Sequence, residues 1–344
     1  MNRLLINAGL YWVLCLNTLL ASSIGVVESR QLYIDFKPDV VIRFDPDYGK
    51  ECNVRRDERR SVISGNLTLR SAADIEAFRC AKRITGNLKL ELDNDIKVLV
   101  LPWLEKVEGN LWLEAGAYFD KARLTKLHTI GGKITLYNRN RNAHWWLPAL
   151  TSHNGTLEVV AGVSNDLTGF DHLAYVQKLY LRTHPNDIYG PFNFSGLNSL
   201  TNVGNIEINV EHGQSSGSFL ANLITVDNKV EITLDDGGLF GLSSIVNIGG
   251  RLEIKDSSYL YNLNHFSNLA SLGGLELEDN PNLNNINQLL GVNMPSNGYI
   301  KIVYNNSLSQ CSAKQVVKGL RNDPNWNNFN GNSTYVYGNG YPDC

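Results

Sequence analysis

Gly65-Asn-Leu-Thr-Leu69 is the stretch that decides the fold, because its pattern returns as Gly86-Asn-Leu-Lys-Leu90 and Gly109-Asn-Leu-Trp-Leu113. Each copy places a Gly or another turn residue before an alternation of apolar, polar and apolar side chains. Eight further copies begin at Gly132, Gly155, Gln177, Gly204, Asn228, Gly250, Gly273 and Gly298. From Gly65 to Gly298 the ten intervals span 233 residues, a mean of 23.3, and a repeat of that length is typical of a solenoid.

The alternation inside each phrase predicts a β-strand, because successive side chains of a strand point to opposite faces. Leu67 and Leu69, and their counterparts in later copies, then point into the molecule. A second apolar set precedes each phrase, for example Leu104 and Val107, and can fill another wall of the same coil. The sequence therefore predicts a mainly β protein, a right-handed parallel β-solenoid of about eleven turns whose stacked units share one core.

The composition is that of a globular protein with ample core. The chain has 344 residues, of which 43% are hydrophobic, and a formal net charge of −3. This balance gives no electrostatic argument for nucleic acid, which favours a basic face. No Lys/Arg cluster indicates binding to a membrane surface, and the polar C-terminal tail lacks the hydrophobic end of a lipid-anchor signal.

The N-terminus has the layout of a secretory signal. Met1-Asn-Arg3 carries positive charge and leads into an apolar stretch that ends in small residues. We expect residues 1–29 to be a signal peptide and the protein to be secreted, extracellular or held at the cell surface or cell wall. An uncleaved N-terminal anchor is the alternative, because the apolar stretch is nearly long enough to span a bilayer.

Four of the five cysteines lie near the ends of the repeat array, since Cys15 falls in the signal segment. Four cysteines allow three connectivities. Only local pairing, Cys52 with Cys80 and Cys311 with Cys344, suits a rod whose ends are far apart, because a disulfide needs Cα atoms within about 7 Å. Disulfides at both caps agree with an oxidising compartment.

The regions flanking the repeats lack the phrase. We expect an N-terminal lead and cap over 30–62, the solenoid over 63–310 and a helical or coil cap over 311–344. A short helix is predicted before Cys80, with Ser71 as its N-cap. Another is predicted to open at a capping box of Ser312 and Gln315, to run to about Leu320, and to cover the open end of the sheet.

Three longer inserts interrupt the array, and insertions in solenoids map to loops that often lie on the binding side. They span Tyr137 to Trp146, His184 to Ser195 and Glu211 to Ser218. The first is the most distinctive, because it contains Arg139-Asn-Arg-Asn-Ala-His-Trp-Trp146.

Cys52, the segment Ser71-Ala-Ala-Asp-Ile-Glu-Ala-Phe-Arg-Cys80, Ile84-Thr-Gly-Asn-Leu and the repeated Leu-x-x-Val/Ile-x-Gly-x-Leu-x-Leu units resemble the receptor L-domain family. The resemblance covers about Cys52 to Cys344 and implies a leucine-rich-repeat-like β-helix with a non-catalytic recognition role. This family occurs in receptor ectodomains, fungal cell-wall surface proteins and secreted bacterial proteins. No cysteine-rich module or kinase domain follows, so receptor signalling is not implied, and the resemblance transfers no site residue.

A search for catalytic motifs finds none that is specific. The seven histidines are scattered, and there is no His-Glu-x-x-His, Gly-x-Ser-x-Gly or phosphate loop. Each lone histidine is interpreted as a surface or turn residue, and no metal site and no cofactor are predicted. Acidic residues that follow several strands are interpreted as turn residues with Asx hydrogen bonds; among them, Asp235-Asp-Gly-Gly238 is the best candidate for a bound cation.

The outward strand face offers the candidate binding residues. Its C-terminal half stacks glutamates with lysines and an arginine beside them, which indicates either a neutralised face or an acidic surface for a basic partner. Its N-terminal half and the adjacent insert carry aromatic and cationic side chains that can stack on sugars or anchor a protein. The candidate ligand-binding residues are Trp112, Lys133, Tyr137, Trp145, Trp146, Tyr180, Arg182, Glu207, Glu231, Glu253 and Glu276.

Five N-glycosylation sequons are present, which matter in a eukaryotic host. They begin at Asn66, Asn154, Asn193, Asn305 and Asn332. Together these patterns favour a secreted, non-enzymatic recognition or adhesion protein that binds an extracellular protein or polysaccharide. A carbohydrate-active β-helix lyase or hydrolase and a structural component of the cell envelope are the alternatives.

Overall fold

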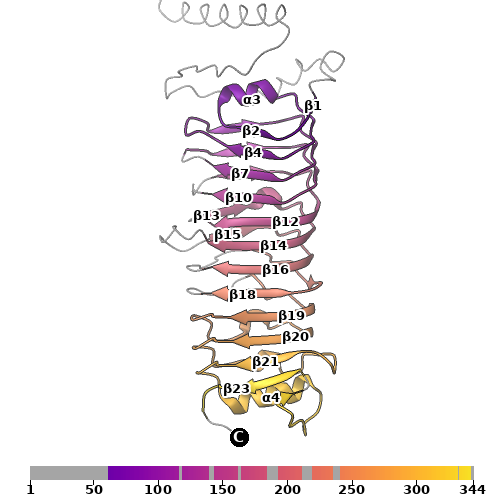
Figure 1. Cartoon of the computed structure of the whole chain (residues 1–344), viewed down its shortest axis with the longest axis vertical. Coiled ribbons are helices and arrows are strands. Elements are labelled where there is room, and N and C mark those ends of the chain that lie inside the picture. Colours follow the sequence, from indigo (N-terminus) through magenta and orange to yellow (C-terminus); the bar gives the residue numbers. More distant parts are fainter. Residues whose placement is uncertain are drawn as a thin grey trace, which may run out of the picture. The chain divides into compact units, whose positions relative to one another are not determined.

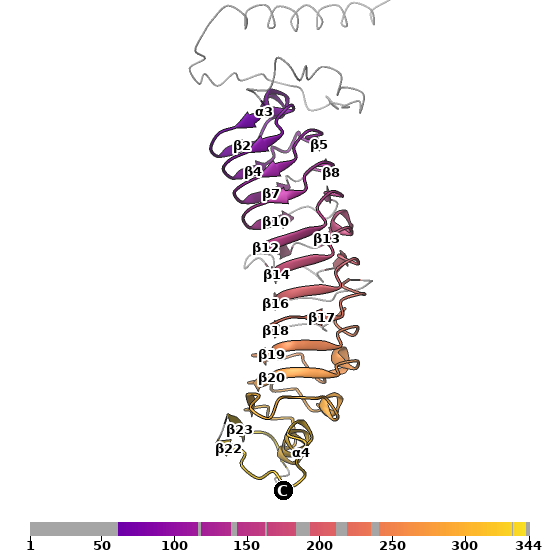
Figure 2. The same cartoon turned by 90° about the vertical axis from the view of Figure 1, so that its right-hand side faces the viewer.

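The computed structural model describes residues 61–115, 118–138, 143–161, 164–183, 193–210, 219–234, 241–331 and 333–341. These residues form a mainly β unit in which the strands stack as successive rungs from β2 to β23 (Figures 1 and 2). The predicted parallel β-solenoid is therefore confirmed. In the described ranges no helix is long and apolar enough to cross a membrane.

Three sheets make up the solenoid. The largest has 14 strands: β2 (Leu67–Leu69), β4 (Leu88–Glu91), β7 (Leu111–Ala115), β10 (Ile134–Asn138), β12 (Ser152–Ala161), β14 (Tyr175–Thr183), β16 (Asn202–Val210), β17 (Thr225–Val226), β18 (Val230–Leu234), β19 (Asn247–Lys255), β20 (Ser271–Glu278), β21 (Ile300–Val303), β22 (Asn330–Gly331) and β23 (Thr334–Tyr337). The four-stranded sheet comprises β1 (Val62–Ile63), β3 (Arg83–Ile84), β6 (Lys106–Val107) and β9 (Thr129–Ile130). The five-stranded sheet comprises β5 (Val98–Val100), β8 (Lys121–Arg123), β11 (His144–Trp146), β13 (Ser164–Leu167) and β15 (Asn193–Gly196).

Each of the eleven phrases forms a strand of the 14-stranded sheet, and consecutive phrases pair in parallel. The structure shows about nine regular turns, however, and not the eleven that the phrase count predicts. The first phrase leads into helix α3 (Ala72–Phe78) and the last into helix α4 (Gln310–Leu320).

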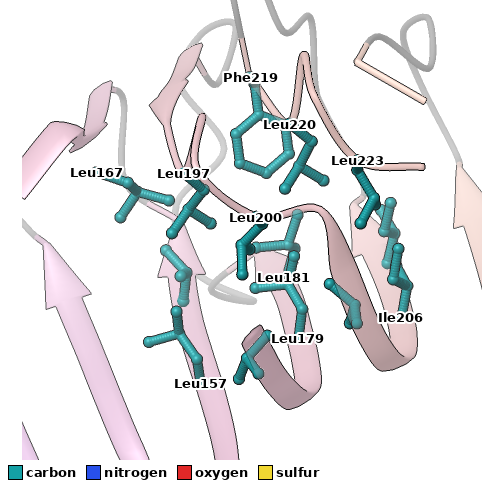
Figure 3. Close-up of a cluster of buried hydrophobic side chains, with 14 of the residues drawn as sticks. Leu157, Leu167, Leu179, Leu181, Leu197, Leu200, Ile206, Phe219, Leu220 and Leu223 are labelled. Atoms are coloured by element: carbon teal, nitrogen blue, oxygen red, sulfur yellow. The ribbon is translucent and has the colours of Figure 1, made fainter. Parts of the chain in front are cut away.

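One continuous apolar core fills the coil, as the sequence predicts. Both inward positions of the phrases are buried, and so is the second apolar set, including Leu104 and Val107. Figure 3 shows how leucines from different turns meet, with Leu179 and Leu181 of β14 facing Leu200. Burying a leucine side chain contributes about 1.5–3 kcal/mol, so the repeated pairs supply most of the driving force for stacking.

The two predicted helices are present, with one change at the start of the second. Ser71 caps α3, and its side chain and that of Asp74 exchange hydrogen bonds with each other's backbone N–H. Helix α4 ends at Leu320 as expected, but it begins at Gln310 with Ser309 as N-cap. The predicted capping box of Ser312 and Gln315 is therefore wrong, because Ser309 already accepts the hydrogen bond from the first turn.

Short 3₁₀ helices form corners of the coil at η2 (Thr168–Phe170), η3 (Asn264–Phe266) and η4 (Asn287–Leu289).

The first insert is more regular than predicted. Tyr137 and Asn138 complete β10, and His144 to Trp146 form β11, so only residues 139–142 of that insert lie outside the described residues. This places the end of the insert in a sheet and not in a loop.

Asparagine side chains stabilise the stack from turn to turn. Outside the coil, the Asn87 backbone N–H donates to Asn66 Oδ1 at 2.9 Å, and the Asn110 N–H donates to Asn87 Oδ1 at 2.7 Å. Inside it, Asn280 Nδ2 donates to Asn305 Oδ1 at 3.0 Å, and Asn305 Nδ2 donates to Asn339 Oδ1 at 3.1 Å. Because Asn305 is fully buried and bonded, its sequon cannot accept a glycan in the folded protein.

Two of the acidic residues that follow strands, Asp256 and Asp279, have the backbone conformation of turn residues. Asp256 and Asp279 adopt positive φ angles of 49° and 52°, the left-handed conformation that asparagine and aspartate tolerate at tight turns. The predicted cation site at Asp235 lies outside the described residues.

Several other predictions also fall on residues outside the described ranges. These are the signal peptide over 1–29, almost all of the lead and cap over 30–62, residues 184–192 of the second insert, and the whole third insert at 211–218. Each predicted disulfide includes one such cysteine, Cys52 or Cys344, so the pairing remains a prediction.

Candidate functional site

The outward side chains of the 14-stranded sheet form one unbroken row. Strand register places the polar residue of each phrase directly opposite the next. The row consists of Thr68, Lys89, Trp112, Thr135, Glu158, Tyr180, Glu207, Glu231, Glu253, Glu276, Lys301 and Tyr335. Its four consecutive glutamates, here called the glutamate ladder, are Glu207, Glu231, Glu253 and Glu276. The stacking predicted from the phrase is thus confirmed.

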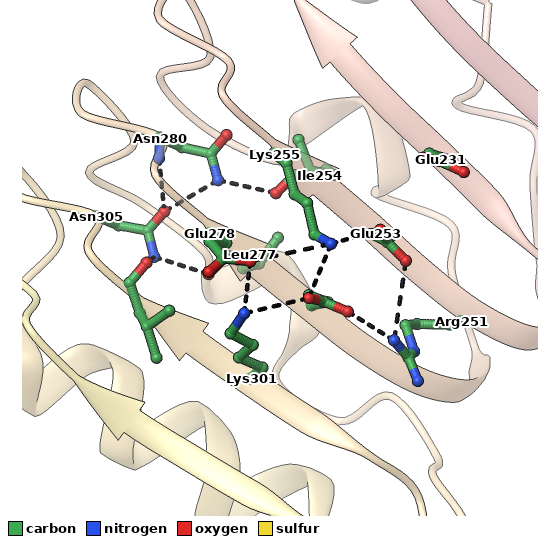
Figure 4. A network of polar contacts seen from close by, with 12 residues as sticks. Glu231, Arg251, Glu253, Ile254, Lys255, Leu277, Glu278, Asn280, Lys301 and Asn305 are labelled. Atoms are coloured by element: carbon green, nitrogen blue, oxygen red, sulfur yellow. Dashed lines mark hydrogen bonds and ion pairs between the residues drawn. The ribbon is translucent and has the colours of Figure 1, made fainter.

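Cations neutralise the C-terminal half of the glutamate ladder, Glu253 and Glu276 (Figure 4). Arg251 Nη1 lies 2.6 Å from Glu276 Oε2, and Lys301 Nζ lies 3.4 Å from Glu276 Oε1. Lys255 Nζ bridges two turns, at 2.7 Å from Glu253 and 3.0 Å from Glu276. The side chains of Glu253 and Glu276 are only 7% and 6% exposed, so neither carboxylate is presented to a partner.

The other rungs of the ladder are paired as well. Lys229 Nζ lies 2.9 Å from Glu231 and 2.8 Å from Glu253, and Lys178 pairs with Glu207. The interpretation of this half as an acidic surface for a basic partner is therefore not supported. Of the two interpretations that the sequence left open, the structure favours the neutralised face, because each carboxylate meets a cation from its own or a neighbouring rung.

The ion pairs lower the pKa values of Glu253 and Glu276. Burial raises the pKa of Glu253, but the hydrogen bonds from Lys229 and Lys255 outweigh it, so the pKa lies below its usual range. Glu276 shows the same balance, with burial opposed chiefly by Lys255 and Arg251. Both groups are thus held ionised as structural anions.

In the N-terminal half of the row, charged and aromatic side chains also pair with neighbours in the same sheet. Lys133 Nζ and Arg182 Nε lie 2.6 Å and 2.8 Å from the buried Glu158 carboxylate, whose pKa they lower against the effect of burial. Trp112 is half-buried and donates from Nε1 to Glu114 at 3.2 Å, while Tyr137 packs beside it with ring centroids 6.5 Å apart. These candidate residues mainly contact one another.

Lysines also lie over two of the aromatic rings of the row, those of Trp112 and Tyr180. Lys89 Nζ lies 5.6 Å from the Trp112 ring centroid, and Lys178 Nζ lies 5.3 Å from that of Tyr180. The predicted aromatic half-face is present, but its rings and cations are already engaged with neighbours in the same sheet.

Trp145 and Trp146 lie on opposite sides of β11. Trp145 is 0% exposed and packs against Phe119 with ring centroids 5.0 Å apart, so its prediction as a ligand contact is wrong. Trp146 is 39% exposed. Because β11 belongs to the five-stranded sheet, Trp146 lies on a different sheet from Trp112 and does not extend the aromatic half-face.

Trp146 lines a shallow pocket of about 470 Å³ on the five-stranded sheet. The pocket, here called the Trp146 pocket, is lined by Lys121, Arg123, Thr125, His144 and Trp146. The register of β8 and β11 sets Lys121 opposite His144 and Arg123 opposite Trp146. Two cations and an indole ring therefore share one outward face, because alternation points all four side chains the same way.

The cations of the Trp146 pocket have no carboxylate partner within the part of the chain that the structure describes. The nearby Asp166 is engaged elsewhere, since its Oδ2 lies 2.9 Å from His144 Nδ1. Its Oδ1 accepts hydrogen bonds from the backbone N–H and the hydroxyl of Thr168, at 3.0 Å and 2.6 Å. Lys121 and Arg123 therefore line the pocket without a carboxylate partner from the described ranges.

Among the described residues, no three His, Cys, Asp or Glu side chains lie where they could hold a metal ion together. The pKa of Asp93 is raised by burial and by the charges of Asp95 and Asp74. One histidine also departs from the surface interpretation, because His153 is buried within β12 and its pKa is lowered by burial.

Comparison of the chain with models of protein families, with characterised proteins and with solved structures finds no match. The resemblance to the receptor L-domain family therefore extends, on these findings, only to the β-solenoid fold.

Sequence reasoning missed Lys121, Arg123 and Thr125, although a signal was present. Lys121-Ala-Arg123 and His144-Trp-Trp146 both alternate outward polar or amphipathic residues with an inward apolar one. That alternation predicts two neighbouring strands and separates Trp145 from Trp146. The interpretation of Tyr137 to Trp146 as one loop insert hides the alternation in His144-Trp-Trp146.

Proposed function

We propose that the chain is a secreted, non-enzymatic recognition protein that binds an anionic extracellular polysaccharide at the Trp146 pocket. The observation that carries the proposal is that the exposed Trp146 ring lies beside two cations that have no carboxylate partner among the described residues. An indole face stacks on the C–H face of a sugar ring, and Arg and Lys attract its carboxylate or sulfate groups.

The remaining features of this proposal come from the sequence. The solenoid is of receptor L-domain type with eleven stacked phrases, and disulfides Cys52–Cys80 and Cys311–Cys344 close its ends. Secretion follows from the signal-like N-terminus over 1–29. Peptide mass spectrometry of the non-reduced protein tests the pairing, and any other connectivity would contradict it.

The test is a binding screen of the purified protein against surface-coupled heparin, polygalacturonate and alginate, with dextran as the neutral control and a cell-surface protein array alongside. Saturable binding to an anionic polysaccharide without turnover is the expected result. Binding only to proteins would overturn the choice of ligand. Release of shorter or unsaturated sugars would overturn the non-enzymatic role and redirect attention to the Asp-rich turns.

Paired variants locate the site. Trp146→Ala and Arg123→Gln are each expected to weaken binding by about tenfold or more, equivalent to about 1.4 kcal/mol. Tyr259→Ala removes another exposed aromatic ring, and Lys318→Gln removes a positive charge from α4, so both serve as matched controls. Equal losses in variants and controls would place the ligand elsewhere.

A further inference from the structure

A second pocket, of about 560 Å³, lies at the C-terminal end of the solenoid. Helix α4, the edge strand β22, the end of β23 and the segments beside them line it. Its volume falls in the range of ligand-binding pockets, roughly 300–1,000 Å³. It shares no residue with the Trp146 pocket, and we call it the cap pocket.

Side-chain amides fix the inner wall of the cap pocket. Gln310, in the first turn of α4, donates from Nε2 to the Val336 carbonyl at 2.8 Å. Its Oε1 accepts a hydrogen bond from Asn339 Nδ2 at 2.8 Å, and Asn339 is in turn bonded to the buried Asn305. The wall is therefore tied to the internal asparagine ladder and preorganised, which lowers the entropic cost of binding.

The rim of the cap pocket carries amides that make no hydrogen bond within the described ranges. Asn327, Asn328 and Asn330 are exposed, and their side chains make no hydrogen bond to another described residue. An amide side chain donates and accepts hydrogen bonds at once, as a sugar hydroxyl does. Three such groups around one hollow match the paired donor and acceptor pattern of a hydroxyl-rich ligand.

Aromatic rings supply the stacking surface. Tyr337 is 39% exposed and its ring is held edge-on against Tyr304, with centroids 5.5 Å apart and an interplanar angle of 84°. Tyr341 is 94% exposed, and Phe329 contributes a third ring, with Lys314 Nζ 5.7 Å from its centroid. Lys314 is the one charged side chain among the described lining residues, so most of the polar side chains that line the pocket are neutral amides.

We infer that the cap pocket binds a neutral saccharide. Exposed amides recognise the hydroxyls, and Tyr337 stacks on the sugar ring. The inference goes beyond the anionic site proposed above and does not depend on it, because the two pockets lie on different elements and differ in charge.

Calorimetric titration of the full chain with neutral hexasaccharides of β-1,4-glucose, β-1,3-glucose, mannose and N-acetylglucosamine tests the inference. At least one is expected to bind, and Tyr337→Ala is expected to weaken that binding by at least tenfold, while Tyr337→Phe retains the ring and most of the affinity. Asn328→Ala, an exposed change that leaves the fold intact, is expected to weaken it several-fold.

Controls separate this site from the Trp146 pocket. Tyr261→Ala removes an exposed tyrosine elsewhere and should leave the affinity unchanged, as should Trp146→Ala. If no neutral hexasaccharide binds, or if Trp146→Ala abolishes the binding while Tyr337→Ala does not, the inference is overturned. If the chain binds a neutral hexasaccharide but none of the anionic polysaccharides, only the function proposed for the Trp146 pocket is contradicted.

Discussion

The outer faces of the 14-stranded and five-stranded sheets carry similar residue types but use them differently. On the 14-stranded sheet, Glu276 and its neighbours in the glutamate ladder meet lysines and arginines from their own or adjacent turns. On the five-stranded sheet, Lys121 and Arg123 meet no carboxylate among the described residues, and Trp146 is exposed beside them.

The difference shows that charge alone does not identify a binding surface in a solenoid. A charged residue that repeats at the same position in successive phrases is stacked at about one strand spacing, roughly 4.8 Å, and is stabilised by opposite charges in the same sheet. Lys121 and Arg123 lie on one strand, β8, of a shorter sheet, and no strand paired with β8 repeats a cation opposite them, so they have fewer potential partners. The irregular face is therefore the better candidate for recognition.

The largest expected effect separates the two tryptophans of β11. Trp145→Ala removes a fully buried ring that packs on Phe119, and we expect a loss of about 3–5 kcal/mol in the free energy of unfolding. Urea denaturation followed by circular dichroism measures it. A loss below 1 kcal/mol would show that Trp145 is not part of the core and would remove the contrast with Trp146.

The next effect tests whether the glutamate ladder is structural. Glu276→Gln leaves Arg251, Lys255 and Lys301 with less compensating charge, and we expect a loss of about 1–3 kcal/mol, since the cations are partly exposed. Glu231→Gln, at a more exposed rung that pairs with Lys229, is the matched control and should cost less than about 1 kcal/mol. Equal stability of both variants would contradict the structural role.

The ladder also predicts sensitivity to acid. The pKa values of Glu158, Glu253 and Glu276 are lower in the folded protein than in the unfolded chain. Their contribution to stability is therefore complete above the unfolded pKa, about 4.3, and is lost as the pH falls through the lowered folded values. Urea midpoints measured from pH 7 to pH 3 should fall most steeply below about pH 4.5, with a shallower fall for Glu276→Gln. An unchanged slope in that variant would argue against the pairing.

The smallest expected effect is on the stability of the candidate site itself. Trp146→Ala should change the free energy of unfolding by no more than about 0.5 kcal/mol, because the ring lies on the surface of the sheet. Thermal unfolding of this variant beside Trp145→Ala gives the direct comparison. A large destabilisation would mean that Trp146 serves the fold, and any loss of polysaccharide binding could then not be assigned to a lost contact.

Much of the fold could be predicted from particular residues. The spacing of the Gly-x-apolar-x-apolar phrase predicted the parallel stack, and Leu67 and Leu69 predicted the inward face. Ser71 was recognised as an N-cap, whereas the start of α4 was misplaced by three residues because Ser309 and Ser312 offer the same capping chemistry. The candidate site was predicted only through Trp146.

By itself, the sequence determined the period, the alternation and therefore the register of the glutamate ladder, because these depend on neighbours along the chain and on one repeated spacing. The tertiary structure decided which charges are neutralised and which remain free. That outcome depends on side chains about 23 residues apart meeting across adjacent turns, as Lys255 meets Glu276 and Asp166 meets His144. It also set Trp145 inside and Trp146 outside, because β11 pairs with β8 to form a third sheet whose existence no single repeat encodes.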